Sequence, residues 1–148
     1  DISPRFYPVH HQIILEGLGS LDFDVIKSRG EADKALSAYI TDFGIRQFLL
    51  KNLYWVKKGR LGLRINLEVL KNEVAEVGEA LPSFAQFKKD TLFLRGDRSE
   101  YIGIDDEAII HNHFPEAQIV TINNAGHWLH AENPKDFFKA VIHFIKLN

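Results

Sequence analysis

The chain of 148 residues contains neither cysteine nor methionine. The lack of cysteine excludes disulfide frameworks, thiolate metal sites and a cysteine nucleophile, and it leaves the redox compartment open. The lack of methionine means that residue 1 is not a translation start, so we expect that processing or truncation removed what came before. No apolar run approaches the roughly 20 residues of a membrane span, and the first residues carry no signal-peptide pattern. A cytoplasmic location is the default expectation.

A strong charge of either sign is also lacking. Lysine and arginine number 18 against 20 acidic residues, which gives a net charge of −2. This balance provides no basic surface for nucleic acid or for an anionic membrane. The sequence also lacks any G-x-S-x-G segment, the elbow that presents a nucleophilic serine in many hydrolases. The apolar fraction of 45% is sufficient for one buried core.

The chain after Pro82 alternates between strand and helix patterns. We expect a strand over Thr91–Arg95, a helix over Asp105–Phe114, a second strand over Gln118–Asn123 and a final amphipathic helix. This alternation is typical of βαβ units on a parallel sheet and places the chain in the α/β class. Two strands and one strand end are too few for a complete parallel sheet, so we expect more of the sheet to come from elsewhere.

Residues 9–81 have a mainly helical pattern and lie between two parts of the α/β framework, residues 1–8 and 82–148. Apolar residues at helical spacing predict one helix across residues 36–44. Alternating apolar residues after the Lys58-Gly59 turn predict a short extended segment. We interpret residues 9–81 as a helical cap or lid inserted into the framework.

A histidine follows the last expected strand, in the loop Asn-Ala-Gly-His-Trp that ends at Trp128. Gly126 allows the backbone to approach closely, and Trp128 supplies an apolar wall that restricts water. Asn133 can cap the last helix, with Pro134 at its first position. These features hold the imidazole from both sides, as general base catalysis requires. We therefore predict that His127 is a catalytic base.

A catalytic histidine needs a carboxylate beside its other nitrogen, to fix the tautomer and to stabilise the imidazolium. In a common arrangement, G-x-x-D, the acid would stand where this chain has Ser99, three residues after Gly96. A serine cannot supply the negative charge. Asp97 lies in the same loop, and Asp1 lies where a neighbouring strand would end, before Pro4. Both aspartates remain candidates.

Other residues invite weaker interpretations. The pair His111 and His113, and the set His127, His130 and Glu132, could be read as metal ligands. A spacing of two on a helix places side chains on different faces, and no third ligand is evident for the first pair. We therefore predict packing or surface roles for these histidines other than His127, and no metal site.

Four aromatic residues are candidate contacts for a substrate. Trp128 borders the histidine, and Tyr101 follows the turn at Gly96 closely enough to approach it. Phe48 and Trp55 lie in the helical insertion and could line an acyl pocket. Aromatic residues at helical spacing are more often part of a core, so this alternative stays open.

Several segments in order along nearly the whole chain resemble the C-terminal part of YbfF-type esterases, which belong to the α/β-hydrolase superfamily. They cover more of the chain than a lone Gly-His motif would, so the resemblance is specific. The segments are Asp1-Ile-Ser-Pro4, Gln47-Phe-Leu-Leu-Lys51, Leu92-Phe-Leu-Arg-Gly96 with Ser99 and Tyr101, and Ala125-Gly-His-Trp-Leu-His-Ala-Glu132 with Pro134.

The resemblance implies a serine hydrolase in which Asp1 matches the acid and His127 matches the base. The serine and most of the oxyanion hole match nothing in this chain and would lie before Asp1. It implies short or medium acyl esters as substrates, with acyl-CoA thioesters as a further class, and no metal or organic cofactor. The expected partner is the missing N-terminal half of the same hydrolase, and this half alone is expected to be inactive.

Two alternatives remain. The chain could be part of another capped α/β-hydrolase, such as a C–C bond hydrolase or an epoxide hydrolase. The identity of the nucleophile would decide, because serine supports ester or C–C chemistry whereas aspartate supports epoxide chemistry. The chain could also be a non-catalytic binding or interaction module that retains a vestigial site.

Overall fold

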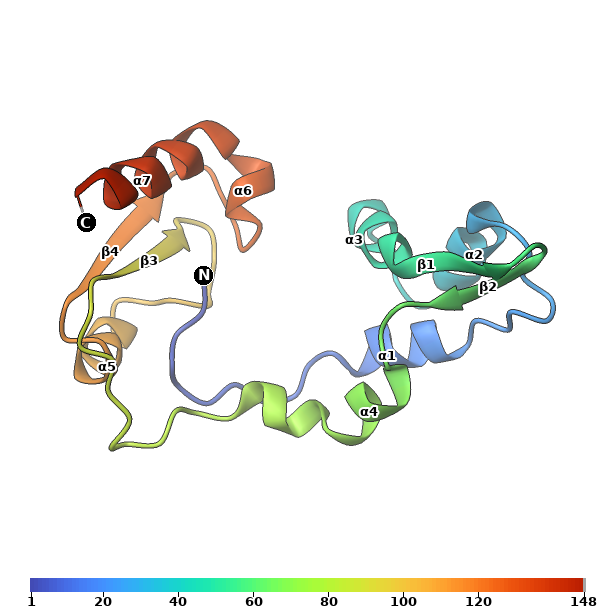
Figure 1. Ribbon diagram of the computed structural model, residues 1–148, viewed down its shortest axis with the longest axis horizontal. Coiled ribbons are helices and arrows are strands. Elements are labelled where there is room, and N and C mark those ends of the chain that lie inside the picture. The colour runs from blue at the N-terminus through green and yellow to red at the C-terminus, as the bar shows by residue number, and fades with distance from the viewer. Residues whose placement is uncertain (148) are drawn as a thin grey trace. The chain divides into compact units, whose positions relative to one another are not determined.

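The computed structural model describes residues 1–147, and the chain divides into two compact units (Figure 1). The first, called the sheet unit below, consists of Asp1–Tyr7 and the chain from Glu79 onward. The second, called the insert unit, is Pro8–Gly78. The assignment of the insert unit as a cap stays a prediction. Among residues 1–147, no helix combines the length and the apolar character needed to cross a membrane.

The sheet unit is built on two parallel strands that are paired in register from Thr91 opposite Ala117 to Gly96 opposite Ile122. A helix connects them, and two further helices follow the second strand, which confirms the predicted α/β class. The elements are β3 (Thr91–Gly96), α5 (Asp106–His113), β4 (Ala117–Ile122), α6 (Leu129–Glu132) and α7 (Pro134–Leu147).

Successive side chains of β3 point to opposite faces of the sheet. Leu94 belongs to a buried cluster against which α7 packs Phe137 and Val141. On the other face, the ring of Phe93 meets the ring of Phe114 edge-on at 5.1 Å, and Arg95 forms a 2.8 Å ion pair with Glu107 of α5. The strand is therefore covered by α7 on one face and by α5 on the other (Figure 1).

Gly96, at the end of β3, is required by the close approach of the loop that follows β4. A Cβ atom at this position would clash with the carbonyl oxygens of Ala125 and Gly126. The Arg98 N–H donates a 3.0 Å hydrogen bond to the carbonyl of Ala125, and the Asp97 N–H donates to that of Ile122 at 3.1 Å. The ends of the two strands and their loops therefore form one tightly packed edge.

The insert unit contains short helices and one β-hairpin around a core that includes the fully buried side chains of Leu36 and Leu50. Its hairpin turns at Gly59, whose φ of 78° lies in the left-handed region that favours glycine. The elements are α1 (Gln12–Gly19), α2 (Arg29–Leu36), α3 (Phe43–Leu49), η1 (Leu50–Asn52), β1 (Leu53–Lys57), β2 (Arg60–Leu63), α4 (Leu67–Asn72) and η2 (Val74–Gly78).

Two local expectations for the insert unit were wrong. The single helix expected across residues 36–44 is divided, because α2 ends at Leu36 and Asp42 starts a new helix by accepting a 2.8 Å hydrogen bond from the Ile45 N–H. The mainly helical pattern expected for this region also missed β1. This segment is a strand because Tyr54, Trp55 and their neighbours pair with β2. Aromatic and β-branched residues fit such a half-buried pleated surface well.

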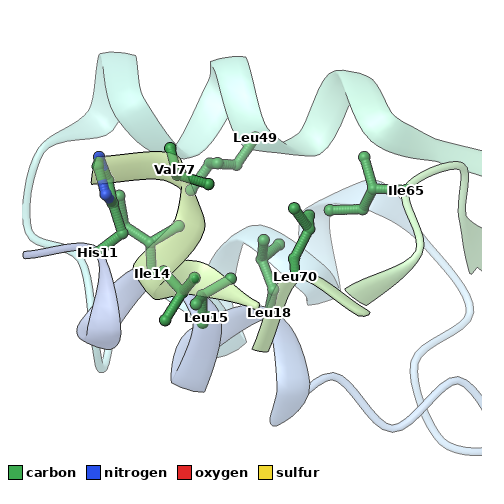
Figure 2. A pocket seen from close by; sticks show the side chains of 9 residues that line it. His11, Ile14, Leu15, Leu18, Leu49, Ile65, Leu70 and Val77 are labelled. Carbon is green, nitrogen blue, oxygen red and sulfur yellow. The ribbon is translucent and has the colours of Figure 1, made fainter. Parts of the chain in front are cut away.

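An apolar cavity of about 230 Å³ lies within the insert unit. Figure 2 shows aliphatic side chains from α1, α4 and neighbouring segments around it, with His11 the polar side chain among them. The residues that line it are His11, Ile14, Leu15, Leu18, Leu49, Ile65, Leu70, Val74 and Val77.

Leu36→Ala should destabilise the insert unit, because Leu36 is 0% exposed and the truncation leaves a cavity in the core. We expect a loss of about 2–5 kcal/mol in the free energy of unfolding, measured by urea denaturation. Val25→Ala is the control, since Val25 is 71% exposed and should change that free energy by no more than about 0.5 kcal/mol. Equal effects of the two substitutions would contradict the assignment of the core.

Candidate active site

The centre of the candidate site is the pair formed by Asp1 and His127. Nδ1 of His127 lies 3.1 Å from Oδ2 of Asp1, a hydrogen bond between residues that are 126 positions apart. The Asp1 side chain is 1% exposed, whereas the His127 side chain is 45% exposed. Because an ionised carboxylate only accepts, Nδ1 carries the proton and donates a hydrogen bond to Oδ2 of Asp1. Nε2 is then the basic nitrogen, and it forms no hydrogen bond with any residue that the structure describes.

Ser99 is a second hydrogen-bond donor to the Asp1 carboxylate. Its hydroxyl donates a 2.5 Å hydrogen bond to Oδ2 of Asp1, the same oxygen that faces the imidazole. The Ser99 oxygen also accepts from the backbone N–H of Tyr101 at 3.3 Å. The sequence marked Ser99 only as a departure from the common acid position. In the structure this serine holds a carboxylate supplied by another segment.

The other candidate acid, Asp97, is engaged elsewhere. Its Oδ1 accepts a 3.0 Å hydrogen bond from the backbone N–H of Ala125, and it forms no bond with His127. The N–H of Asn124 is the largest influence on this carboxyl and lowers its pKa below the ordinary value. Asp97 therefore fixes the loop that carries the histidine, while Asp1 contacts the imidazole itself.

The loop around His127 is held from both sides. Before the histidine, Asn124 has a φ of 56°, a left-handed conformation that asparagine tolerates. Gly126 donates its N–H to Oε2 of Glu132 at 2.9 Å, and the side chain of Asn133 donates to the carbonyl of Asn123 at 2.9 Å. The contacts to Glu132 and Asn133 tie the loop to the end of α6 and to the residue that precedes α7, and they restrict the position of the imidazole.

An aromatic ring lies on the imidazole. The Tyr101 ring stacks on the His127 ring, with centroids 4.1 Å apart and planes 25° apart. Trp128 is the next residue and is partly buried. Of the four predicted substrate contacts, Tyr101 is thus brought to the imidazole and Trp128 is adjacent in the chain. Phe48 and Trp55 belong to the insert unit, where they are 52% and 57% exposed, and their role stays a prediction.

Burial lowers the pKa of His127 below its ordinary value of 6.5. Removal of the ring from water disfavours the charged imidazolium. The imidazole is therefore neutral near pH 7 and able to accept a proton. A neutral imidazole with one nitrogen fixed and the other accessible is the arrangement of a general base.

The remaining histidines and acids have other contacts. His113 is buried, and its Nδ1 donates to the carbonyl of Ala85 at 2.7 Å. The ring of His130 meets the ring of Phe137 edge-on, with centroids 6.1 Å apart, and Glu132 accepts from the loop backbone. Within residues 1–147, no group of three or more histidine and acidic side chains is arranged to hold a metal ion.

No protein-family model matches the chain. The "sn-1-specific diacylglycerol lipase ABHD11" of Mus musculus is 40% identical over 119 residues, covering 80% of this chain and 38% of the relative. "Esterase YbfF" of Escherichia coli is 26% identical over 151 residues, covering 98% of this chain and 55% of the relative.

A solved structure described as "Marine microorganism esterase" superposes with a TM-score of 0.91 at 34% sequence identity. The match covers 97% of this chain and 58% of that chain. The chain thus spans about half the length of the relatives that it matches. By sequence and by fold, it corresponds to the C-terminal part of an α/β-hydrolase related to the YbfF-type esterases.

Proposed function

We propose that this chain supplies the acid and the base of a serine esterase. The observation that carries the proposal is the 3.1 Å contact between Nδ1 of His127 and the buried carboxylate of Asp1, with Nε2 directed away from it. This is the acid–base half of a catalytic triad. The relatives named above, an esterase and a lipase that cleave esters, support the same chemistry.

The nucleophile is a serine supplied by the other half of the hydrolase. This chain has no nucleophile elbow, and it covers only about half of its relatives. Nε2 of His127 removes the proton from the serine hydroxyl as its oxygen attacks the ester carbonyl. The imidazolium then donates that proton to the departing alkoxide, which leaves an acyl-enzyme. In the second half of the cycle, Nε2 activates a water molecule in the same way and the acid product departs.

Asp1 holds the imidazole in the tautomer that leaves Nε2 free, and its negative charge stabilises the imidazolium formed in each step. The hydrogen bond from Ser99 fixes the carboxylate oxygen that faces the ring. No step needs a metal or an organic cofactor. The proposed partner is therefore the nucleophile-bearing half of the same hydrolase, which also supplies most of the oxyanion hole.

The insert unit is proposed as the cap over the acyl group. Phe48 and Trp55 are large apolar side chains that are exposed within this unit, and they are available to contact an acyl chain. We propose acyl esters as the substrate class, including the lipid esters that the diacylglycerol lipase relative suggests, with acyl-CoA thioesters as a further class. The cytoplasmic location expected from the sequence stays a prediction.

Asp1→Asn in the full-length hydrolase should reduce kcat by about 10³–10⁴-fold, because an amide favours the wrong tautomer of His127 and cannot stabilise the imidazolium. Asp97→Asn is the matched control. An asparagine still offers an oxygen to the N–H of Ala125, so we expect a loss of no more than about tenfold. Steady-state hydrolysis of an aryl ester measures both. The reverse order of the two effects would assign the acid to Asp97.

The pH dependence of kcat/KM should have its acidic limb below pH 6.5. The base must be neutral, and burial lowers the pKa of His127 below 6.5. Activity is therefore retained as the pH falls through 6.5 and is lost only at the lower pKa of the folded protein. An acidic limb with its midpoint above 6.5 would show that the carboxylate attraction dominates instead.

The purified chain alone should not hydrolyse an aryl ester such as nitrophenyl butyrate, because it contains a base and an acid without a serine elbow. Turnover should appear when the nucleophile-bearing half is added, and His127→Ala should abolish it. Turnover by the isolated chain, shown to be free of any second fragment and abolished by His127→Ala, would refute the half-site proposal.

A further inference from the structure

Tyr7 connects two segments that meet at the candidate site. Its side-chain oxygen accepts a 2.9 Å hydrogen bond from the backbone N–H of Ser3, two residues after Asp1. The same hydroxyl donates to the backbone carbonyl of Tyr101. Tyr7 is 8% exposed, so both hydrogen bonds are shielded from water. One hydroxyl therefore joins the segment that carries the acid to the segment that carries the ring stacked on the base.

The position of the Tyr7 ring is itself fixed. The guanidinium of Arg5 lies over the ring, 4.0 Å from its centroid, and its Nε forms a 2.9 Å ion pair with Oδ1 of Asp106. The Asp106 side chain is 8% exposed, and its Oδ2 accepts from the N–H of Gly103 at 2.7 Å. The ring is thus anchored through Arg5 to the start of α5, away from the reacting groups.

These contacts reach both members of the acid–base pair. Through Ser3, the Tyr7 hydroxyl restrains the backbone that places the Asp1 carboxylate. Through the Tyr101 carbonyl, it restrains the residue whose ring lies 4.1 Å from the His127 ring and whose N–H bonds to Ser99. Both sides of the 3.1 Å contact between acid and base therefore depend on one side chain that touches neither.

We propose that Tyr7 is a positioning residue of the site, and that its hydroxyl sets the alignment of Asp1, Tyr101 and His127. The expected effect on kcat rests on the proposed function. The alignment itself involves only residues of the sheet unit. Tyr7 was absent from the residues that the sequence singled out. Its hydrogen bond with Tyr101 spans 94 positions in the chain, and such a contact leaves no local pattern.

Tyr7→Phe is the decisive variant, because it removes the hydroxyl and keeps the ring beneath Arg5. In the full-length hydrolase we expect kcat to fall about 10- to 100-fold with KM changed by less than about twofold, since misalignment impairs the chemical step more than binding. In the isolated chain we expect the imidazole proton signals of His127 to move downfield in the NMR spectrum, as the Tyr101 ring loses its stacked position.

Two controls separate positioning from folding. Tyr39→Phe removes a tyrosine hydroxyl from the insert unit, which contributes no residue to the Tyr7 network, and should leave kcat and the His127 signals unchanged. Ile110→Val removes a buried methyl group from α5 and lowers the stability of the same unit without touching the network. Signals and kcat of Tyr7→Phe that match those of Ile110→Val at equal stability would overturn the proposal.

The two measurements also separate this inference from the proposed function. If the full-length protein hydrolyses no ester but Tyr7→Phe still moves the His127 signals, the esterase proposal fails and the positioning role stands. If ester hydrolysis depends on His127 but Tyr7→Phe retains the wild-type kcat and signals, the esterase proposal stands and the role of Tyr7 is refuted.

Discussion

The hydrogen bond between Asp1 and His127 is the constraint on which the site depends, because it joins residues 126 positions apart in the sequence. A carboxylate that is 1% exposed loses most of its hydration, and this cost is tolerated only when donors replace the water. The Ser99 hydroxyl and the His127 imidazole provide donors to Oδ2, whereas the buried Oδ1 has no hydrogen-bond partner among the described residues. The need to satisfy one buried charge therefore brings together the start of the chain, the loop after β3 and the loop after β4.

The two aspartates of the site, Asp1 and Asp97, have different roles. Asp97 is bound to the backbone of the histidine loop and gives that loop its shape, whereas Asp1 is bound to the ring that the loop presents. Partial burial favours the neutral form of His127. Nδ1 is directed towards the buried Asp1 carboxylate, and Nε2 is left accessible. One aspartate thus holds the backbone of the loop, and the other contacts the ring.

Much of this architecture could be read from the sequence, because it is encoded in local patterns. The alternation of β3, α5, β4 and α7 follows from periodicity, and the loop pattern around His127 predicts that this residue is a base. The division between α2 and α3 depends on a single cap at Asp42, and β1 depends on pairing across the Gly59 turn. The contacts of Tyr7 with Tyr101 span 94 positions. Such contacts leave no periodic signal, so the sequence could not indicate them.

Because Gly96 has no side chain, the loop that carries His127 can pack directly against the end of β3. The histidine loop lies so close to the end of β3 that even one added carbon atom would displace it. The loop and the strand therefore behave as one body, and the pairing of β3 with β4 sets the position of the base as well as that of the core. A shift of that pairing by one residue would reverse the faces of the strand. The register between β3 and β4 therefore determines where the imidazole lies, because the backbone of the histidine loop contacts Gly96.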